Sequence, residues 1–326
     1  MRSLLRRTPR TATKRIFFAT DLHGSEQCFR KFLNAGAVYD ASFLIIGGDI
    51  LGKRLVPIVE NGAGRFSAQY AEHRYTDLEK DGLAAIKATI RAHGDYPIVT
   101  TREEAKEFAD TEHMDAVFRK VAYDSVADWV TLAEERLRGS GRRCFVAPGN
   151  DDFLEIDSAL QNSDVVEFAE DRCIRLDEDY EMITTGYSNP TPWDTERELP
   201  EDQLKARIRA LAAKASGTDD LIAVLHPPPY DCQLDLAPRL REDYSIVMTG
   251  GQAQMVPVGS TAVREFIEET QPLLGLHGHV HESAGSTHIG RTLCINPGSE
   301  YTQGVLDGAI IGLAAGGVRS HQFVSG

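Results

Sequence analysis

Seven side chains of the types that bind metal ions recur along the chain in five short, widely separated motifs. They are Asp21, His23, Asp49, Asn150, His226, His279 and His281. Two divalent cations held roughly 3.5–4 Å apart need a shared anionic bridge and several further ligands each. Carboxylate, amide and imidazole groups are such ligands. The set therefore predicts two divalent metal ions per chain, drawn from Mn, Fe, Ni or Zn.

Asp49 is the natural bridge in this set, because a carboxylate has two oxygens and a negative charge to divide between two cations. Gly47 and Gly48 precede it and allow the backbone to turn tightly near the ions. Gly24 and Gly278, in two other motifs, keep Cβ atoms away from the same region. We expect the glycines to be part of the site.

One residue separates His279 from His281, and one separates Asp21 from His23. In an extended backbone, residues at this spacing project from the same side, so we expect each pair to point together. Taken singly, matches this short arise often by chance, and a lone histidine is usually structural. The ordered set, with each motif following a strand candidate, carries the prediction.

The elements that must position these residues are short apolar runs bounded by turn residues. They cover residues 16–20, 43–46, 144–148, 221–225 and 272–276. Such runs favour strands buried on both faces of a sheet. In open α/β sheets, ligands gather outside the carboxyl ends of the strands, which is where the polar residues of this chain occur.

Residues 52–140, between the second and third motifs, are predicted to form a helical insertion in a single domain that spans residues 1–326. Thr101 and Glu104 have the spacing of a capping box at a helix start. Apolar residues then recur at three- and four-residue spacing, at Met114, Val117, Val121, Trp129 and Leu132. The insertion either lies beside the site or forms a surface layer without contact to substrate. Residues 1–14 are predicted to be a disordered lead-in.

The motif order resembles that of the calcineurin-like metallophosphoesterase superfamily over residues 15–301. The motifs are Asp21-x-His23, Gly48-Asp49, Gly149-Asn150, His226 and Gly278-His279-x-His281. The segment 296–299 is similar to the one that follows the last motif in smaller bacterial phosphodiesterases of this family. The resemblance implies an α/β fold in which two mixed β-sheets are sandwiched between helices, as four αββα layers, with residues 52–140 inserted.

The resemblance also implies how the ligands divide between two metals. One metal takes Asp21, His23, Asp49 and His281, and the other takes Asp49, Asn150, His226 and His279. Two metals in such a site would lower the pKa of a bridging water, and the resulting hydroxide would attack phosphorus. The predicted function is metal-dependent hydrolysis of a small, nucleotide-like phosphodiester or phosphomonoester, with manganese among the candidate metals.

Asp151 departs from the family pattern, because many members carry a histidine at this position that assists the leaving group. A carboxylate near two dications should have a lowered pKa, so we expect Asp151 to be ionised. It would then accept a hydrogen bond from His23 or from a substrate hydroxyl, or else face away. Asp152 is expected to orient a ligand imidazole through its free N–H, or to lie at the surface.

Tyr187, Asn189 and Trp193 follow the strand candidate at residues 181–185 and form an aromatic and polar loop. Such a loop offers contacts to the base or sugar of a substrate. The alternative is a structural turn fixed by Pro190.

Composition limits the remaining choices. The formal net charge of −14 argues against binding to long nucleic acids, which needs basic surface. Five separated cysteines without a CxxC pattern indicate a reducing, cytoplasmic setting. No apolar stretch approaches the roughly 20 residues that span a membrane. The alternatives are a nuclease, a non-catalytic scaffold of the same fold and a single structural zinc, and the oligomeric state stays open.

Overall fold

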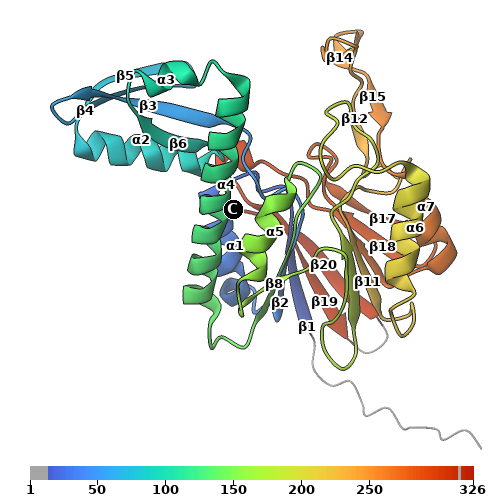
Figure 1. Ribbon diagram of the computed structural model, residues 1–326. Helices are drawn as coiled ribbons and strands as arrows, with labels where there is room; N and C mark the ends of the chain where they lie inside the picture. The colour runs from blue at the N-terminus through green and yellow to red at the C-terminus, as the bar shows by residue number, and fades with distance from the viewer. Residues whose placement is uncertain (1–13, 315–316) are drawn as a thin grey trace, which may run out of the picture.

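Two six-stranded sheets lie at the centre of the computed structural model, which describes residues 14–314 and 317–326 (Figure 1). The first contains, in spatial order, β20 (Gly317–Ser325), β19 (Asp307–Ala314), β1 (Lys14–Ala19), β2 (Phe43–Gly47), β7 (Arg143–Ala147) and β8 (Val166–Phe168). The second contains β17 (Gly285–Ile289), β18 (Thr292–Asn296), β16 (Leu274–Leu276), β11 (Leu221–Leu225), β10 (Glu181–Thr185) and β9 (Arg172–Arg175).

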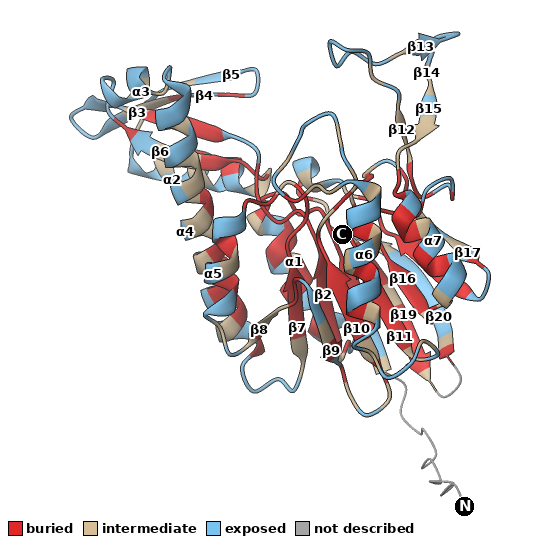
Figure 2. Ribbon diagram, turned by 45° about the vertical axis from the view of Figure 1, so that its right-hand side comes forward, coloured by how far each residue is buried: buried red, intermediate tan, exposed pale blue. Residues whose placement is uncertain are grey.

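Three apolar cores separate the layers. One core lies between the sheets and includes Phe18 and Ile45 from the first sheet and Val224 from the second. A second core joins the first sheet to α1 (Glu26–Val38), α4 (Thr111–Leu137) and α5 (Asp157–Gln161). A third joins the second sheet to α6 (Glu201–Ala212) and α7 (Thr261–Thr270). The predicted order of helix, sheet, sheet and helix is confirmed (Figure 2).

All five apolar runs that precede the motifs form strands of these two sheets. β1, β2 and β7 are parallel neighbours in the first sheet, and β11 is parallel to β16 in the second. β2 and β11 are buried along their whole length, as expected for strands covered on both faces. The carboxyl ends of these strands meet at one edge of the molecule, the upper edge in Figure 1.

The insert, residues 52–140, differs from the largely helical segment predicted for it. It contains helices α2 (Lys80–Ala92), α3 (Glu104–Glu107) and α4, but also a four-stranded sheet. The strands, in spatial order, are β5 (His73–Leu78), β4 (Arg65–Tyr70), β3 (Leu55–Gly62) and β6 (Tyr96–Thr100). The capping box is confirmed, since Glu104 N–H donates to Thr101 Oγ1 at 3.1 Å and Thr101 N–H donates to Glu104 Oε2 at 2.8 Å.

The small sheet forms around a glycine-rich hairpin turn, and apolar and polar residues alternate in β4, where Phe66, Ala68 and Tyr70 are the apolar members. Val56 and Ile58 of β3 and Tyr70 of β4 are buried against Ile86 and Ile90 of α2. The turn between β3 and β4 contains Gly62 and Gly64, both with positive φ. A Cβ added to either glycine would have no other atom within 4 Å. The hairpin turn and the alternation in β4 favour strands in this part of the insert, whereas the helical pattern farther along the insert forms α4.

A second outgrowth, the arm, covers residues 236–257. It consists of two-stranded pairs formed by β12 (Leu236–Pro238) with β15 (Met255–Pro257) and by β13 (Met248–Thr249) with β14 (Gln252–Ala253). The insert and the arm both rise from the edge at which the parallel strands end (Figure 1). They therefore flank the loops that carry the candidate ligands.

All five cysteines are free. Within the described ranges, the helices are too short or too polar for any of them to cross a membrane. The predicted lead-in lies outside the described residues except for Lys14, which begins β1.

Candidate metal centre

The candidate ligands from all five motifs converge at the upper edge of the two sheets. Asp21, His23 and His281 form one group, in which one ligand atom from each residue lies within 4.8 Å of the others. Asp49, His226 and His279 form a second group by the same measure. Each of these two groups could hold a metal ion, and the grouping agrees with the division of ligands that the resemblance implies.

Asp49 lies between the two groups. Its Oδ2 is 3.7 Å from His23 Nε2 in the first group, whereas its Oδ1 is 3.3 Å from His226 Nε2 in the second. The two oxygens of one buried carboxylate therefore face imidazoles that belong to different groups. This arrangement fits the bridging position expected of Asp49.

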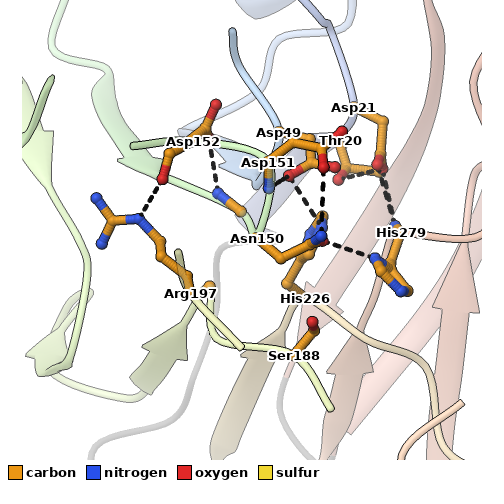
Figure 3. Close-up of polar contacts among 12 residues, drawn as sticks. Thr20, Asp21, Asp49, Asn150, Asp151, Asp152, Ser188, Arg197, His226 and His279 are labelled. Carbon is orange, nitrogen blue, oxygen red and sulfur yellow. Dashed lines mark hydrogen bonds and ion pairs between the residues drawn. The ribbon is translucent and has the colours of Figure 1, made fainter. Parts of the chain in front are cut away.

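Asn150 adds an amide oxygen to the second group. Its Oδ1 lies 2.8 Å from His279 Nδ1 (Figure 3). Its Nδ2 donates to Thr195 Oγ1 at 3.0 Å. Because the amide nitrogen is engaged by Thr195, the oxygen is the atom directed toward the site. The amide offers an oxygen ligand without adding negative charge.

Backbone carbonyls orient two of the imidazoles. His23 Nδ1 lies 3.2 Å from the carbonyl of Leu51, and His226 Nδ1 lies 3.0 Å from the carbonyl of Gly47. When each Nδ1–H donates to its carbonyl, Nε2 keeps a lone pair that points into the site. His23 Nε2 then lies 3.1 Å from His281 Nε2, and a cation shared by such nitrogens fits this approach.

Asp152 does not orient an imidazole, so the predicted role was wrong. Its side chain is fully buried and accepts hydrogen bonds from the backbone N–H groups of Ile50, Leu51 and Gly149, at 3.0, 2.8 and 2.7 Å. The carboxylate therefore ties the loop after β2 to the loop after β7. Burial and the charge of Asp49 raise the pKa of Asp152 to about 7, against these three hydrogen bonds.

Glycines leave the room that the candidate ligands fill. A Cβ on Gly48 would lie 2.1 Å from His226 Nδ1, and one on Gly149 would lie 2.1 Å from Asp49 Oδ1. A Cβ on Gly278 would lie 2.3 Å from Asp21 Oδ2. Real Cβ atoms do not approach other atoms this closely, so each position requires glycine for steric reasons.

Four of the candidate ligands adopt the left-handed backbone region that non-glycine residues rarely occupy. They are Asp21, His23, Asp49 and His279, with φ of 54°, 41°, 49° and 67°. The expectation of an extended backbone at the two paired motifs was therefore wrong. Since the chain turns at these residues, His279 and His281 enter different groups. Backbone strain of this kind is concentrated at functional sites.

Charges inside the site polarise it strongly. Burial favours a neutral Asp21, but its contact with His281 outweighs burial and lowers the pKa of Asp21 to about 2. Burial and the charge of Lys53 lower the pKa of His23 to about 3, and burial with the charge of His226 lowers that of His279 to about 4. Both imidazoles are therefore neutral at pH 7, the state that binds metal.

His226 behaves differently. Burial disfavours its charged form, but the carboxylate of Asp49 outweighs burial and raises the pKa of His226 to about 10. Protonated His226 thus compensates the negative charge of the Asp49 carboxylate. A divalent cation between the same two groups would take the place of that proton, which is the usual exchange when a metal binds.

Asp151 has a different partner from the one expected. Its Oδ2 lies 2.8 Å from Nζ of Lys53 instead of accepting a hydrogen bond from His23. Its backbone N–H donates to Asp49 Oδ1 at 3.0 Å, and its carboxylate forms a third close group with His23 and Asp49. Burial and Asp49 raise the pKa of Asp151 in the chain without metals, while Lys53 opposes the shift.

The three predicted substrate-binding residues are dispersed. The Tyr187 ring packs under the guanidinium of Arg207, 4.0 Å from its centroid, and Asn189 Nδ2 donates to the carbonyl of Val258 at 3.2 Å. Trp193 is 63% exposed, and its ring lies 6.5 Å from that of Tyr244 at the base of the arm. Of the three, Trp193 has a face open to a ligand.

Sequence reasoning missed several residues around the ligands. Thr195 orients Asn150, and the buried Arg197 donates from Nε to the carbonyl of Asp152 at 2.8 Å. The Tyr301 ring lies 4.6 Å from that of His23. Single polar residues in loops give no spacing pattern, so only the segment at 296–299 gave a signal, and there Ser299 Oγ donates to the carbonyl of Asp21 at 2.7 Å.

The insert contacts the ligand loops directly. A Cβ on Gly94, between α2 and β6, would lie 2.1 Å from the carbonyl oxygen of His23. A Cβ on Gly52 would lie 2.0 Å from the carbonyl oxygen of Gly94, and one on Gly24 would lie 2.6 Å from it. Three glycines thus allow the backbones to pack together. The insert therefore packs against the loops that carry the candidate ligands.

No protein-family model matches the chain. A segment of 152 residues, 46% of this chain, is 28% identical to the uncharacterized protein MJ1162 of Methanocaldococcus jannaschii and spans 61% of that protein's length. The crystal structure of TT1561 of Thermus thermophilus aligns over 97% of this chain and 99% of its own, at 14% identity and a TM-score of 0.52. Another crystal structure aligns over the same shares, at 14% identity and a TM-score of 0.54.

Yfce, a phosphoesterase from E. coli, aligns over 94% of this chain and 98% of its own, at 11% identity. Its TM-score of 0.33 is too low to support an inference about activity. The likeness to known structures concerns the fold, and it agrees with the two mixed sheets and the helices on their outer faces. The chain therefore shares the overall fold of these two crystal structures.

Proposed function

We propose that the protein is a metal-dependent phosphoester hydrolase that acts on a small phosphomonoester or phosphodiester. The observation that carries the proposal is the position of Asp49, whose two oxygens face His23 and His226 from separate ligand groups. A single structural metal would not need a carboxylate shared between two groups. Two cations that share one carboxylate are the arrangement used for displacement at phosphorus.

The donor set fits two divalent ions of intermediate hardness. Asp21, His23 and His281 would hold one ion, with Asp49 shared, and Asn150, His226 and His279 would complete the other. Mixed oxygen and nitrogen donors suit Mn, Fe, Ni or Zn, whereas structural zinc prefers closed sites rich in cysteine. The steric need for glycine at Gly48, Gly149 and Gly278 supports the same assignment.

Two ions in this site would polarise phosphoryl oxygens and lower the pKa of a water molecule, which supplies the nucleophile. The chain itself would keep the donors oriented. The carbonyls of Leu51 and Gly47 fix the tautomers of His23 and His226, and Thr195 fixes the amide of Asn150. The cysteines are not needed as nucleophiles.

Substrate contacts beyond the phosphate are proposed at the exposed faces of Trp193 and Tyr244. Trp193 is two residues from Thr195, which contacts Asn150, so the aromatic pair lies on the side of the second ligand group. Aromatic faces of this kind stack on bases without regard to sequence. With a net charge of −14, a small nucleotide-like substrate is favoured over a nucleic acid polymer. A cytoplasmic setting stays a prediction from cysteine usage.

The proposal is tested by elemental analysis of the purified protein, together with assays on p-nitrophenyl phosphate and bis-p-nitrophenyl phosphate in each candidate metal. We expect two metals per chain after reconstitution and hydrolysis that disappears with a chelator. Fewer than one metal per chain, with no turnover in any metal, would reject the enzyme. Metal binding without turnover would favour a non-catalytic scaffold, and cleavage of long DNA or RNA that falls steeply with salt would favour a nuclease.

A further inference from the structure

Lys53 is a partly exposed cation beside the candidate metal ligands. It follows the buried loop of Asp49, Leu51 and Gly52, and its side chain is 49% exposed. Nζ lies 2.8 Å from Asp151 Oδ2, and the Asp151 carboxylate lies in the close group with His23 and Asp49. The ammonium is therefore separated from the candidate ligands by a single carboxylate.

The backbone on both sides of Lys53 is fixed. Gly52 N–H donates to the hydroxyl of Tyr96 at 2.8 Å. Arg54 forms a two-point contact with Asp95, with Nε and Nη2 donating at 3.1 and 2.6 Å. Both neighbours of Lys53 are thus anchored by contacts to residues 95 and 96, and the Lys53 side chain extends to Asp151.

An ordinary surface ion pair does not account for this position. Such pairs contribute little to stability and are common where both partners are exposed. Here the partner Asp151 has a side chain only 24% exposed and lies beside Asp49, a second carboxylate. An ammonium has three N–H donors, and the exposed half of the side chain leaves donors accessible to a ligand.

We propose that Lys53, positioned by Asp151, binds a third non-bridging phosphoryl oxygen and so selects phosphomonoesters over phosphodiesters. The inference rests on the proposed function, because it assumes that two metals engage two of the non-bridging oxygens. A phosphomonoester has three such oxygens and a diester has two. Only the monoester then has an oxygen left for Lys53, and lysine binds phosphate as a point charge.

The test compares Lys53→Met, Lys53→Arg and Asp151→Asn with the metal-loaded wild type on both p-nitrophenyl substrates. Lys53→Met should lower kcat/KM on the monoester by at least about tenfold, as expected for loss of a charge-assisted hydrogen bond, and should change the diester rate little. Lys53→Arg should restore part of the loss. Lys120→Met is the matched control, since Lys120 pairs with Asp124 at 2.6 Å on the exposed face of α4.

Binding of inorganic phosphate, measured by calorimetry on the same metal-loaded proteins, gives a readout without turnover. We expect weaker binding by Lys53→Met and by Asp151→Asn at unchanged metal content. Equal losses on both substrates, phosphate binding like that of the wild type, or a wild type that cleaves only diesters would overturn the role of Lys53 and leave the hydrolase intact. A wild type without metal would overturn both.

Discussion

The ligand loops and the two outgrowths beside them, the insert and the arm, differ in how tightly their residues are packed. In the ligand loops, polar side chains are buried and glycines leave no room for a Cβ. In the insert and the arm, glycines such as Gly64 and Gly250 face open space, and large apolar residues such as Tyr244 and Met248 are more than half exposed. The loops therefore tolerate almost no change in shape, whereas the outgrowths tolerate many.

Because of this difference, we expect metal binding and substrate selection to depend on different parts of the molecule. Under the proposed function, metal binding would depend on atoms that the core strands place at one edge, so it should fail after small changes in the loops. Under the same proposals, selection among substrates would depend on the outgrowths and on Lys53, which lies where the loop of Asp49 enters the insert. Changes there should alter specificity while the metals stay bound.

The largest effect is expected for Asp49→Asn. The amide keeps the volume and the left-handed φ of 49° but removes the charge that two cations would share. We expect turnover to fall by several orders of magnitude and at least one metal to be lost, measured by kinetics and elemental analysis. Asp77→Asn in the insert, at a φ of 54°, is the control and should leave both unchanged. Near-normal turnover of Asp49→Asn would mean that the metals are arranged differently.

The second-largest loss of metal binding is expected for Gly48→Ala. Its Cβ would lie 2.1 Å from His226 Nδ1, and its φ of 137° is unfavourable for alanine. We expect His226 to be displaced and the second metal to bind weakly, as read from metal titration. Gly64→Ala, at a φ of 70° with open space around it, should cost about 1 kcal/mol of stability and no metal. Equal metal loss in both variants would refute the contrast between the loops and the outgrowths.

Thr195→Val should weaken metal binding and activity less than the two substitutions above. The methyl group keeps the shape but removes the acceptor for Asn150 Nδ2. Loss of such a supporting contact typically costs about 10–100-fold in metal affinity or activity. Thr89→Val, in which an exposed helix hydroxyl on the insert is lost, serves as the control. If the two variants bind metal equally well, Thr195 does not orient the amide.

An effect on stability alone, and not on metal binding, is expected at Glu170, which accepts a hydrogen bond from Gly186 N–H at 2.7 Å where the loop to Thr195 begins. Burial raises the pKa of Glu170 from 4.5 to about 7, so the folded state binds its proton more tightly than the unfolded state. This contribution is present below pH 4.5 and is lost as pH rises to about 7, at most about 3 kcal/mol.

Glu170→Gln keeps the acceptor and cannot ionise. Denaturant titrations at pH 5 and pH 8 should show that the variant loses less stability with rising pH than the wild type. Parallel pH dependences for the two proteins would show that Glu170 is not protonated in the folded state at low pH.

The sequence was sufficient for the parts of the fold in which residue type and local pattern agree. The five strands and the capping box at Thr101 were predicted because short apolar runs and an S/T-x-x-E spacing have local causes. The seven ligand positions come together as expected, although their role as ligands stays a prediction. The sheet of the insert was missed because its alternation around Gly62 was read as part of a helical segment.

Contacts between distant loops could not be read from the sequence. Asp151 and Asp152 are adjacent, yet one pairs with Lys53 and the other with the amides of Ile50 and Leu51. Which partner each finds depends on how the loops after β2 and β7 meet, and that is set by the packing of the sheets. The same holds for Thr195, which is 45 residues from Asn150.

The central claim is that Asp49 joins two metal ions in one site. The most direct measurement is electron paramagnetic resonance of the protein reconstituted with Mn²⁺, together with the manganese content. Two ions that share a carboxylate should give two metals per chain and the broad, many-line spectrum of a coupled pair, which Asp49→Asn should abolish. A simple six-line spectrum of isolated Mn²⁺ at full occupancy, or saturation at one ion per chain, would contradict the account.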